Sequence, residues 1–209
     1  MSDSPCILGV MILAAGRSTR MGRPKLLLAW GPTSILGHFI QLWRTLGAAQ
    51  VAIVHAADDP IIPAELDRLG FPLTDRVANP DPERGMFASI LCAARWPGWG
   101  PSLTHWAIVL GDQPHLRIGT LQRLLNLSNH HPEQVCQLVS NGRRRHPVLI
   151  PKSVFCELGK SAAADLKGFL QNQSIAVCEA DDPGLDLDID RPEDYQRAMV
   201  LAGVSQQRN

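Results

Sequence analysis

The chain has 209 residues, with 20 basic and 20 acidic side chains and a formal net charge of zero. Hydrophobic residues make up 45% and charged residues 19%, which indicates a globular protein and argues against a disordered one. The balanced charge argues against electrostatic binding of nucleic acid, and no apolar run approaches the roughly 20 residues of a membrane span. Residues 1–5 lack the positively charged flank of a signal peptide. We therefore expect a single domain, residues 1–209, located in the cytoplasm.

Strand-like and helix-like segments alternate along the chain. In chain order, the patterns predict strands at 7–14, 50–55, 73–78, 106–110, 135–140, 147–150, 174–179 and 185–189. They predict helices at 35–46, 63–69, 87–95, 118–127, 151–158, 162–170 and 191–201, with Ser34 capping the first. Near-continuous apolar strands between helices indicate a doubly wound α/β fold, with a mainly parallel sheet covered by helices on both faces. Ligands of such sheets bind beyond the carboxyl ends of the strands.

The first predicted strand runs into residues 12–28, ILAAGRSTRMGRPKLLL. Its small residues let a ligand approach the backbone closely and leave N–H groups free to face an anion. Four basic residues follow at positions suited to a polyphosphate, Arg17, Arg20, Arg23 and Lys25. The segment has neither the Walker pattern nor the dinucleotide fingerprint. We predict a nucleoside triphosphate site here; the alternative is an ordinary connection with solvated basic side chains.

Asp112 directly follows the predicted strand WAIVL and one glycine, so its carboxylate is expected at the ligand-binding edge of the sheet. A carboxylate that faces a phosphate-binding loop suits Mg²⁺, which prefers one or two carboxylates together with phosphate oxygens and water. The alternative is an aspartate that caps a turn or the next helix. We favour the metal site.

Three aspartates alternate in LDLDID, Asp186, Asp188 and Asp190, and an extended strand would place all three on one face. Asp190 and Glu193 fit a capping box at the start of the last helix, with Asp190 as the N-cap. Asp188 has no such duty, so we predict it as the second metal ligand; the alternative is an exposed carboxylate.

Two further segments are candidates for ligand contacts. Residues 79–89, NPDPERGMFAS, form a proline-broken loop that enters a helix, in which Gly85 permits close approach and Ser89 can bond a base or sugar. Residues 143–147, RRRHP, can hold an acceptor phosphate through arginine. An ordinary loop and a solvated hairpin tip are the respective alternatives.

Five segments occur in the order found in molybdenum cofactor cytidylyltransferases: LAAGRSTRMGRPKLLL, GMFAS, GDQP, HPVLIP and DIDRPEDY. From residue 10 to about residue 199 the chain resembles this family, within the wider group of nucleotidyltransferases with a molybdopterin-guanylyltransferase-like domain. The LAAG spelling is similar to the cytidylyl branch, whereas the guanylyl branch more often has LAGG. One stretch departs from the family: its GDxGAR-like sequence is replaced here by GKSAAA at residues 159–164.

The resemblance implies a doubly wound sheet with one antiparallel strand, and nucleotidyl transfer with loss of pyrophosphate. It implies Arg20, Lys25 and Asp112 as catalytic residues and Asp112 and Asp188 as Mg²⁺ ligands. On the acceptor side it matches His146, beside Arg145. The predicted nucleotide contacts are Leu13, Ala14, Ala15, Gly16, Arg17, Lys25, Asn79, Gly85 and Ser89.

The expected substrates are CTP and the molybdopterin cofactor, with a molybdoenzyme as a further partner and neither nucleic acid nor membrane involved. Two other functions stay open. One is a nucleotidyltransferase that acts on a sugar or polyol phosphate, and the other is a non-catalytic nucleotide-binding accessory protein for a molybdoenzyme.

Overall fold

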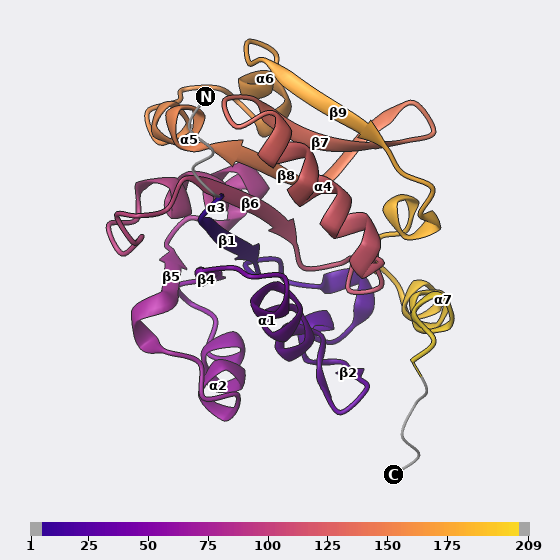
Figure 1. Ribbon diagram of the computed structural model, residues 1–209. Helices are drawn as coiled ribbons and strands as arrows, with labels where there is room; N and C mark the ends of the chain where they lie inside the picture. Colours follow the sequence, from indigo (N-terminus) through magenta and orange to yellow (C-terminus); the bar gives the residue numbers. More distant parts are fainter. Residues whose placement is uncertain (1–5, 205–209) are drawn as a thin grey trace.

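The computed structural model describes residues 6–204, so the predicted absence of a signal peptide at residues 1–5 lies outside the described residues. Seven strands form the main sheet in the order β5-β4-β1-β6-β8-β7-β9 (Figure 1). Their bounds are β1 Leu8–Leu13, β4 Gln50–Ala56, β5 Arg76–Asn79, β6 His105–Leu110, β7 Val135–Ser140, β8 Arg143–Pro151 and β9 Ile175–Glu179. Neighbouring strands pair in parallel except for β8, which runs antiparallel to both β6 and β7. The predicted doubly wound sheet with one antiparallel strand is confirmed.

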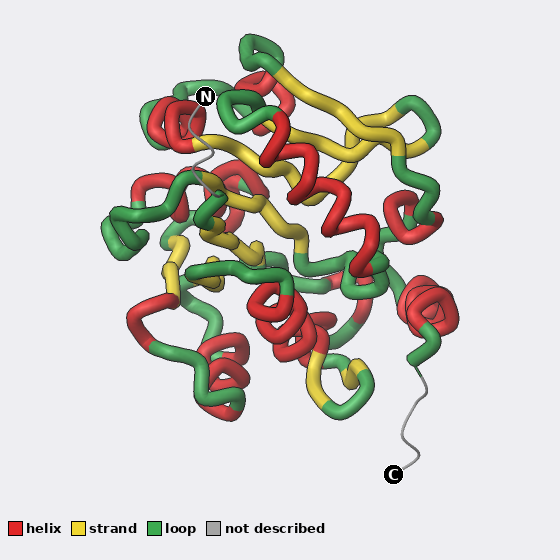
Figure 2. Tube along the Cα trace, viewed as in Figure 1, coloured by secondary structure: helices red, strands yellow, loops and turns green. Residues whose placement is uncertain are grey.

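Helices cover both faces of this sheet (Figure 2). Their bounds are α1 Ile35–Thr45, α2 Ile61–Arg68, α3 Met86–Arg95, α4 Ile118–His130, α5 Lys152–Leu158, α6 Leu166–Leu170 and α7 Pro192–Ala202. A second, two-stranded antiparallel sheet joins β2 Ala29–Trp30 to β3 Thr33–Ser34. None of the helices within residues 6–204 is both long and apolar enough to cross a membrane.

Each face of the sheet has its own hydrophobic core because successive strand residues point to opposite sides. In β1, Val10 and Ile12 pack with α1 and α4, whereas Met11 packs with α3 and α5. The predicted N-cap of α1 is confirmed: the Gly37 amide donates to Ser34 Oγ at 3.1 Å. These two cores hold the strands in place. The loops that follow the carboxyl ends of the parallel strands are thereby positioned at one edge of the sheet.

The segment before α7 differs from the prediction of a strand at 185–189, which is wrong. A 3-10 turn, Pro183–Asp186, occupies its start, and the chain continues without regular structure. The three aspartates therefore do not share one strand face, and their carboxylates take different partners.

The predicted cap of the last helix is also wrong by one residue. Arg191 is the N-cap of α7, and the carboxylate of Asp194 accepts its backbone N–H at 2.9 Å. The Asp190 side chain is therefore free to bind elsewhere. Two smaller differences are that residues 73–75 form a 3-10 turn ahead of the short β5, and that α6 begins only at Leu166.

Candidate active site

A cavity of about 260 Å³ lies where the loop after β1, the start of α3 and the end of β6 meet. Its wall includes residues from three distant parts of the sequence: Leu13, Ala14, Ala15, Gly16, Ser18, Lys25, Leu26, Pro82, Gly85, Met86, Ser89, Leu110, Gly111 and Asp112. The strands β1 and β6 are parallel neighbours, so the loops that follow them reach the same edge of the sheet. Lys25 and Asp112 thus share one cavity.

The loop after β1 is held open by its backbone geometry. The Ala14 amide donates to the carbonyl of Val54 on β4 at 2.7 Å, which ties the start of the loop to the sheet. Ser18 and Gly22 adopt positive φ angles of 50° and 67°, and Ser18 Oγ accepts the Lys25 amide at 3.2 Å. No atom lies within 4 Å of the place a Cβ would take on Gly16, so a ligand has open access to the backbone there.

Arg17 does not line this cavity. Its guanidinium donates to Asp58 at 2.9 Å and to Glu83 at 2.6 Å. Arg17 lines an adjoining hollow of about 390 Å³, which shares residues of the loop after β1 with the cavity, among them Gly16 and Lys25. The hydrogen bonds to the two carboxylates raise the pKa of Arg17 above its ordinary value. In this structure Arg17 ties three loops together at the surface.

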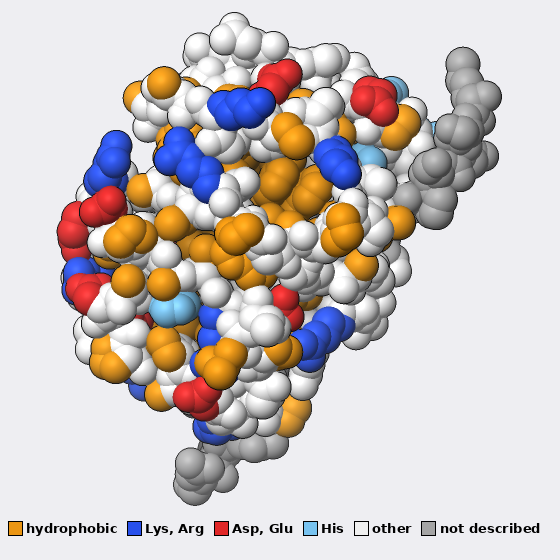
Figure 3. All heavy atoms as spheres, turned by 90° about the vertical axis from the view of Figure 1, so that its left-hand side faces the viewer, with side chains coloured by type: hydrophobic (Ala, Val, Ile, Leu, Met, Phe, Trp, Pro, Cys, Tyr) orange, Lys and Arg blue, Asp and Glu red, His pale blue; other side chains and the backbone are white. Residues whose placement is uncertain are grey.

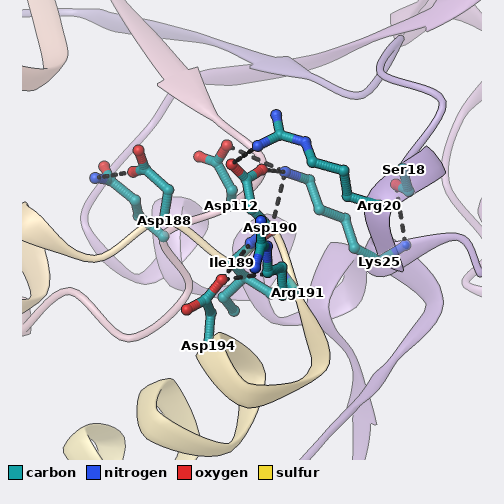
Figure 4. A network of polar contacts seen from close by, with 10 residues as sticks. Ser18, Arg20, Lys25, Asp112, Asp188, Ile189, Asp190, Arg191 and Asp194 are labelled. Carbon is teal, nitrogen blue, oxygen red and sulfur yellow. Dashed lines mark hydrogen bonds and ion pairs between the residues drawn. The ribbon is translucent and has the colours of Figure 1, made fainter. Parts of the chain in front are cut away.

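Four charged side chains meet beside the cavity: Lys25 and Asp112 line its wall, and Arg20 and Asp190 lie next to them (Figure 4). Lys25 Nζ donates to Asp112 Oδ2 at 3.1 Å and to the carbonyl of Ile189 at 3.2 Å, and lies 3.9 Å from Asp190 Oδ1. The Arg20 guanidinium donates to Asp190 Oδ2 at 2.7 Å. The side chains of Lys25 and Asp112 are only 16% and 21% exposed, which strengthens their attraction relative to a surface pair.

The carboxylates beside this network fit a divalent cation. Asp112 Oδ1 is buried and has no hydrogen-bond partner, and Asp188 Oδ1 accepts from Gln113 at 2.9 Å. Burial raises the pKa of Asp188, and the negative charge of Asp112 raises it further. Two nearby carboxylates suit Mg²⁺ when phosphate oxygens and water supply the other ligands. Residues 6–204 contain no cluster of three or more His, Cys, Asp or Glu side chains suited to a metal.

The predicted ligand contacts in residues 79–89 take two different positions. Gly85, with φ 87°, and Ser89 line the cavity, and α3 begins at Met86 without a side-chain cap on its first amides. Such uncapped amides carry partial positive charge that favours an anionic or polar ligand. Asn79 is buried away from the cavity wall and donates to Ser89 Oγ at 2.9 Å. Asn79 thus orients Ser89.

Of the residues predicted to bind the acceptor, Arg145 forms an ion pair with Asp186, which also accepts from Ser140 at 2.9 Å and from Asn141 at 2.7 Å. His146 is half-buried and lies close to Asp112, whose negative charge raises the pKa of the ring. Burial nevertheless lowers the pKa of His146, which favours the neutral ring, and its Nδ1 has no partner.

Residues 161–164, in the stretch that departs from the family pattern, line a third hollow of about 820 Å³ over the outer surface of α3. This hollow is on the side of the molecule seen in Figure 3, where apolar side chains form the floor of a depression with basic side chains around it.

The sequence patterns missed two residues at this site. Gln113 bonds the predicted metal ligand Asp188, and its only signal was its place directly after Asp112. Asp190 faces both Arg20 and Lys25, but its fit to a capping box concealed this position. The sequence did hold a signal for this: Asp194 lies three residues after Arg191, so a capping box that begins at Arg191 was also possible. In that alternative the Asp190 side chain is not needed for the cap.

Curated relatives of this chain bear several names. A molybdenum cofactor guanylyltransferase of Rhizobium johnstonii is 34% identical over 169 residues, 79% of this chain and 73% of that protein. A molybdenum cofactor cytidylyltransferase of Escherichia coli is 24% identical over 93% of this chain and 95% of that protein. A nicotine blue oxidoreductase of Paenarthrobacter nicotinovorans is 26% identical over 95% of this chain and 98% of that protein.

Among solved structures, a nucleotidyl transferase from Methanothermobacter thermautotroptrophicus has a TM-score of 0.73 over 91% of this chain and 95% of that one. At 20% identity this likeness concerns the fold alone. Residues 10–181 match the model of the MobA-like NTP transferase domain, a range that holds the loop after β1, the start of α3 and Asp112. The chain belongs to the MobA-like NTP transferase domain family.

Proposed function

We propose that this protein is a Mg²⁺-dependent cytidylyltransferase that transfers CMP from CTP to the phosphate of the molybdopterin cofactor and releases pyrophosphate. One observation carries this proposal: Lys25 and Asp112 share a cavity whose other walls are an open backbone turn and the uncapped start of α3. A turn of that kind suits phosphate groups, and a polar helix start suits a base or ribose.

The reaction needs no covalent intermediate because the acceptor phosphate is already ionised. One of its oxygens forms a bond to the α-phosphorus of CTP, and the bond from that phosphorus to the bridging oxygen breaks as pyrophosphate leaves. Lys25 and Arg20 bind the triphosphate and neutralise charge on the leaving group, while the turn at Gly16 orients it. When bound by Asp112 and Asp188, Mg²⁺ would supply further charge neutralisation at the phosphates.

The choice of CTP rests on the LAAG spelling of the first loop and on the cytidylyltransferase relative from Escherichia coli. A relative named for guanylyl transfer is also similar to this chain, so the base must be tested directly. We would measure pyrophosphate release from CTP and from GTP with Mg²⁺, in the presence and absence of reduced molybdopterin cofactor. Release from CTP that depends on the cofactor supports the proposal, and equal turnover with GTP contradicts the base assignment.

The acceptor has a specific alternative. Arg145 is already paired with Asp186, and residues 159–164 lack the Asp and Arg of the family pattern, so the acceptor side has fewer free cations than the resemblance implies. A sugar or polyol phosphate in the same assay tests this alternative. Tight CTP binding without pyrophosphate release from any acceptor would instead favour an accessory protein that serves a molybdoenzyme.

A further inference from the structure

The ammonium group of Lys25 is surrounded by oxygen atoms, as a bound metal ion would be. It lies among three oxygens from two segments: Asp112 Oδ2 at 3.1 Å, the Ile189 carbonyl at 3.2 Å and Asp190 Oδ1 at 3.9 Å. Figure 4 shows its contacts with these groups, with the side chain of Arg20 running alongside that of Lys25 to reach the same Asp190. Two cations and two carboxylates thus neutralise each other before any ligand binds.

This arrangement disfavours a divalent cation at Asp112. Lys25 binds Oδ2 of that carboxylate, and a metal on the unpartnered Oδ1 would lie close enough to the ammonium group for the two cations to repel each other in a partly buried site. We expect this repulsion to weaken metal binding for as long as Lys25 stays on Asp112. The triphosphate offers it new oxygen partners, because Lys25 also lines the cavity next to the open turn at Gly16.

We propose that Lys25 is the counter-cation of Asp112 in the nucleotide-free protein, so that the divalent cation is accepted only together with a triphosphate that takes over Lys25. Asp190 is then a positioning residue, which keeps Lys25 and Arg20 at the cavity until the triphosphate replaces it as their partner. The inference rests on the proposed function, since it assumes a metal–triphosphate ligand.

The test titrates Mn²⁺ into the nucleotide-free protein and follows free Mn²⁺ by electron paramagnetic resonance. Lys25→Met removes the ammonium group but keeps an unbranched side chain that is shorter by one atom, and we expect the variant to bind Mn²⁺ about tenfold more tightly or better. The matched control is Lys167→Met on the exposed side of α6, which should bind Mn²⁺ as the wild type does. Adding Asp112→Asn to Lys25→Met should abolish the gain. Equal Mn²⁺ affinity in the wild type and Lys25→Met would overturn the inference.

A second measurement tests Asp190 with inorganic tripolyphosphate in metal-free buffer, by calorimetry. Asp190→Asn removes the carboxylate that competes for Arg20 and Lys25, so we expect several-fold tighter binding than in the wild type. A residue with only a structural role would leave this affinity unchanged or weaken it, and either result, or no binding by both proteins, would overturn the role of Asp190. Neither measurement involves an acceptor or a base, so failure of CTP or of the cofactor in the turnover assay would count against the proposed function alone.

Discussion

The proposed nucleotide side and the proposed acceptor side of this site hold their charged groups in different ways. On the proposed nucleotide side, Lys25 and Arg20 are paired with Asp112 and Asp190, and Lys25 and Asp112 line the cavity. We propose that an incoming ligand replaces these partners. On the acceptor side, Arg145 is paired with Asp186, which Ser140 and Asn141 also bind, so the pair ties the β7–β8 hairpin to the segment before α7. We therefore expect the Lys25–Asp112 network to bind a ligand and the Arg145–Asp186 pair to stabilise the fold.

The largest effect should come from Asp112→Asn. Loss of this carboxylate removes the partner of Lys25 and the proposed metal ligand, so Mg²⁺-dependent turnover should fall by about a hundredfold or more. Pyrophosphate release measures the rate, and circular dichroism checks that the fold is retained. The exposed Asp181→Asn is the control. A variant with near-normal turnover would remove Asp112 from the chemistry.

Lys25→Ala should weaken nucleotide binding in a manner that depends on the number of phosphates. We expect the affinity for CTP to fall by about tenfold or more and the affinity for CMP to change much less, because a charge-assisted contact to the terminal phosphates is lost. Calorimetry with both nucleotides measures the two losses. Equal weakening of CTP and CMP would show that Lys25 does not contact the outer phosphates.

Arg145→Ala should instead act on stability. It leaves Asp186 with its Ser140 and Asn141 partners but without the guanidinium, and the cost should be about 1 kcal/mol, a few degrees in melting temperature. The affinity for CTP should not change. The exposed Arg144→Ala serves as the control, with neither property altered. Weaker CTP binding by Arg145→Ala would contradict the division between the two sides.

The smallest expected effect is a dependence of stability on pH. Burial lowers the pKa of His38, His105, His115 and His146, so the unfolded chain takes up protons on these rings at a higher pH than the folded protein does. Stability should therefore fall as the pH drops below about 6.5. Thermal melts between pH 7.5 and about 5 measure this slope, which His146→Gln should reduce. An unchanged slope in that variant would mean that His146 protonates without cost in the folded state.

Much of the fold was predictable because each apolar strand carries its own periodic signal. The buried run of β6 and the Ser34 cap of α1 depend on local sequence alone. The segment before α7 was not predictable in this way, since alternating aspartates read as a strand although no neighbouring strand was available to pair with it.

The shared cavity was predictable at the level of elements and not at the level of side chains. Parallel strands place the loop after β1 and Asp112 at one edge of the sheet, which follows from topology. The side-chain contacts depend on partners that are distant in sequence. Examples are the hydrogen bonds of Arg17 with Asp58 and Glu83, that of Asn79 with Ser89, and the ion pair of Arg145 with Asp186. No local pattern contains those partners.

The most direct test of the central claim is a crystal structure with Mg²⁺ and a non-hydrolysable CTP analogue. We predict that the triphosphate lies against the Gly16 turn in contact with Lys25, and that the metal bridges it to Asp112, with the base beside Gly85 and Ser89. A nucleotide bound away from this cavity, or a triphosphate that touches neither Lys25 nor a metal on Asp112, would contradict the account.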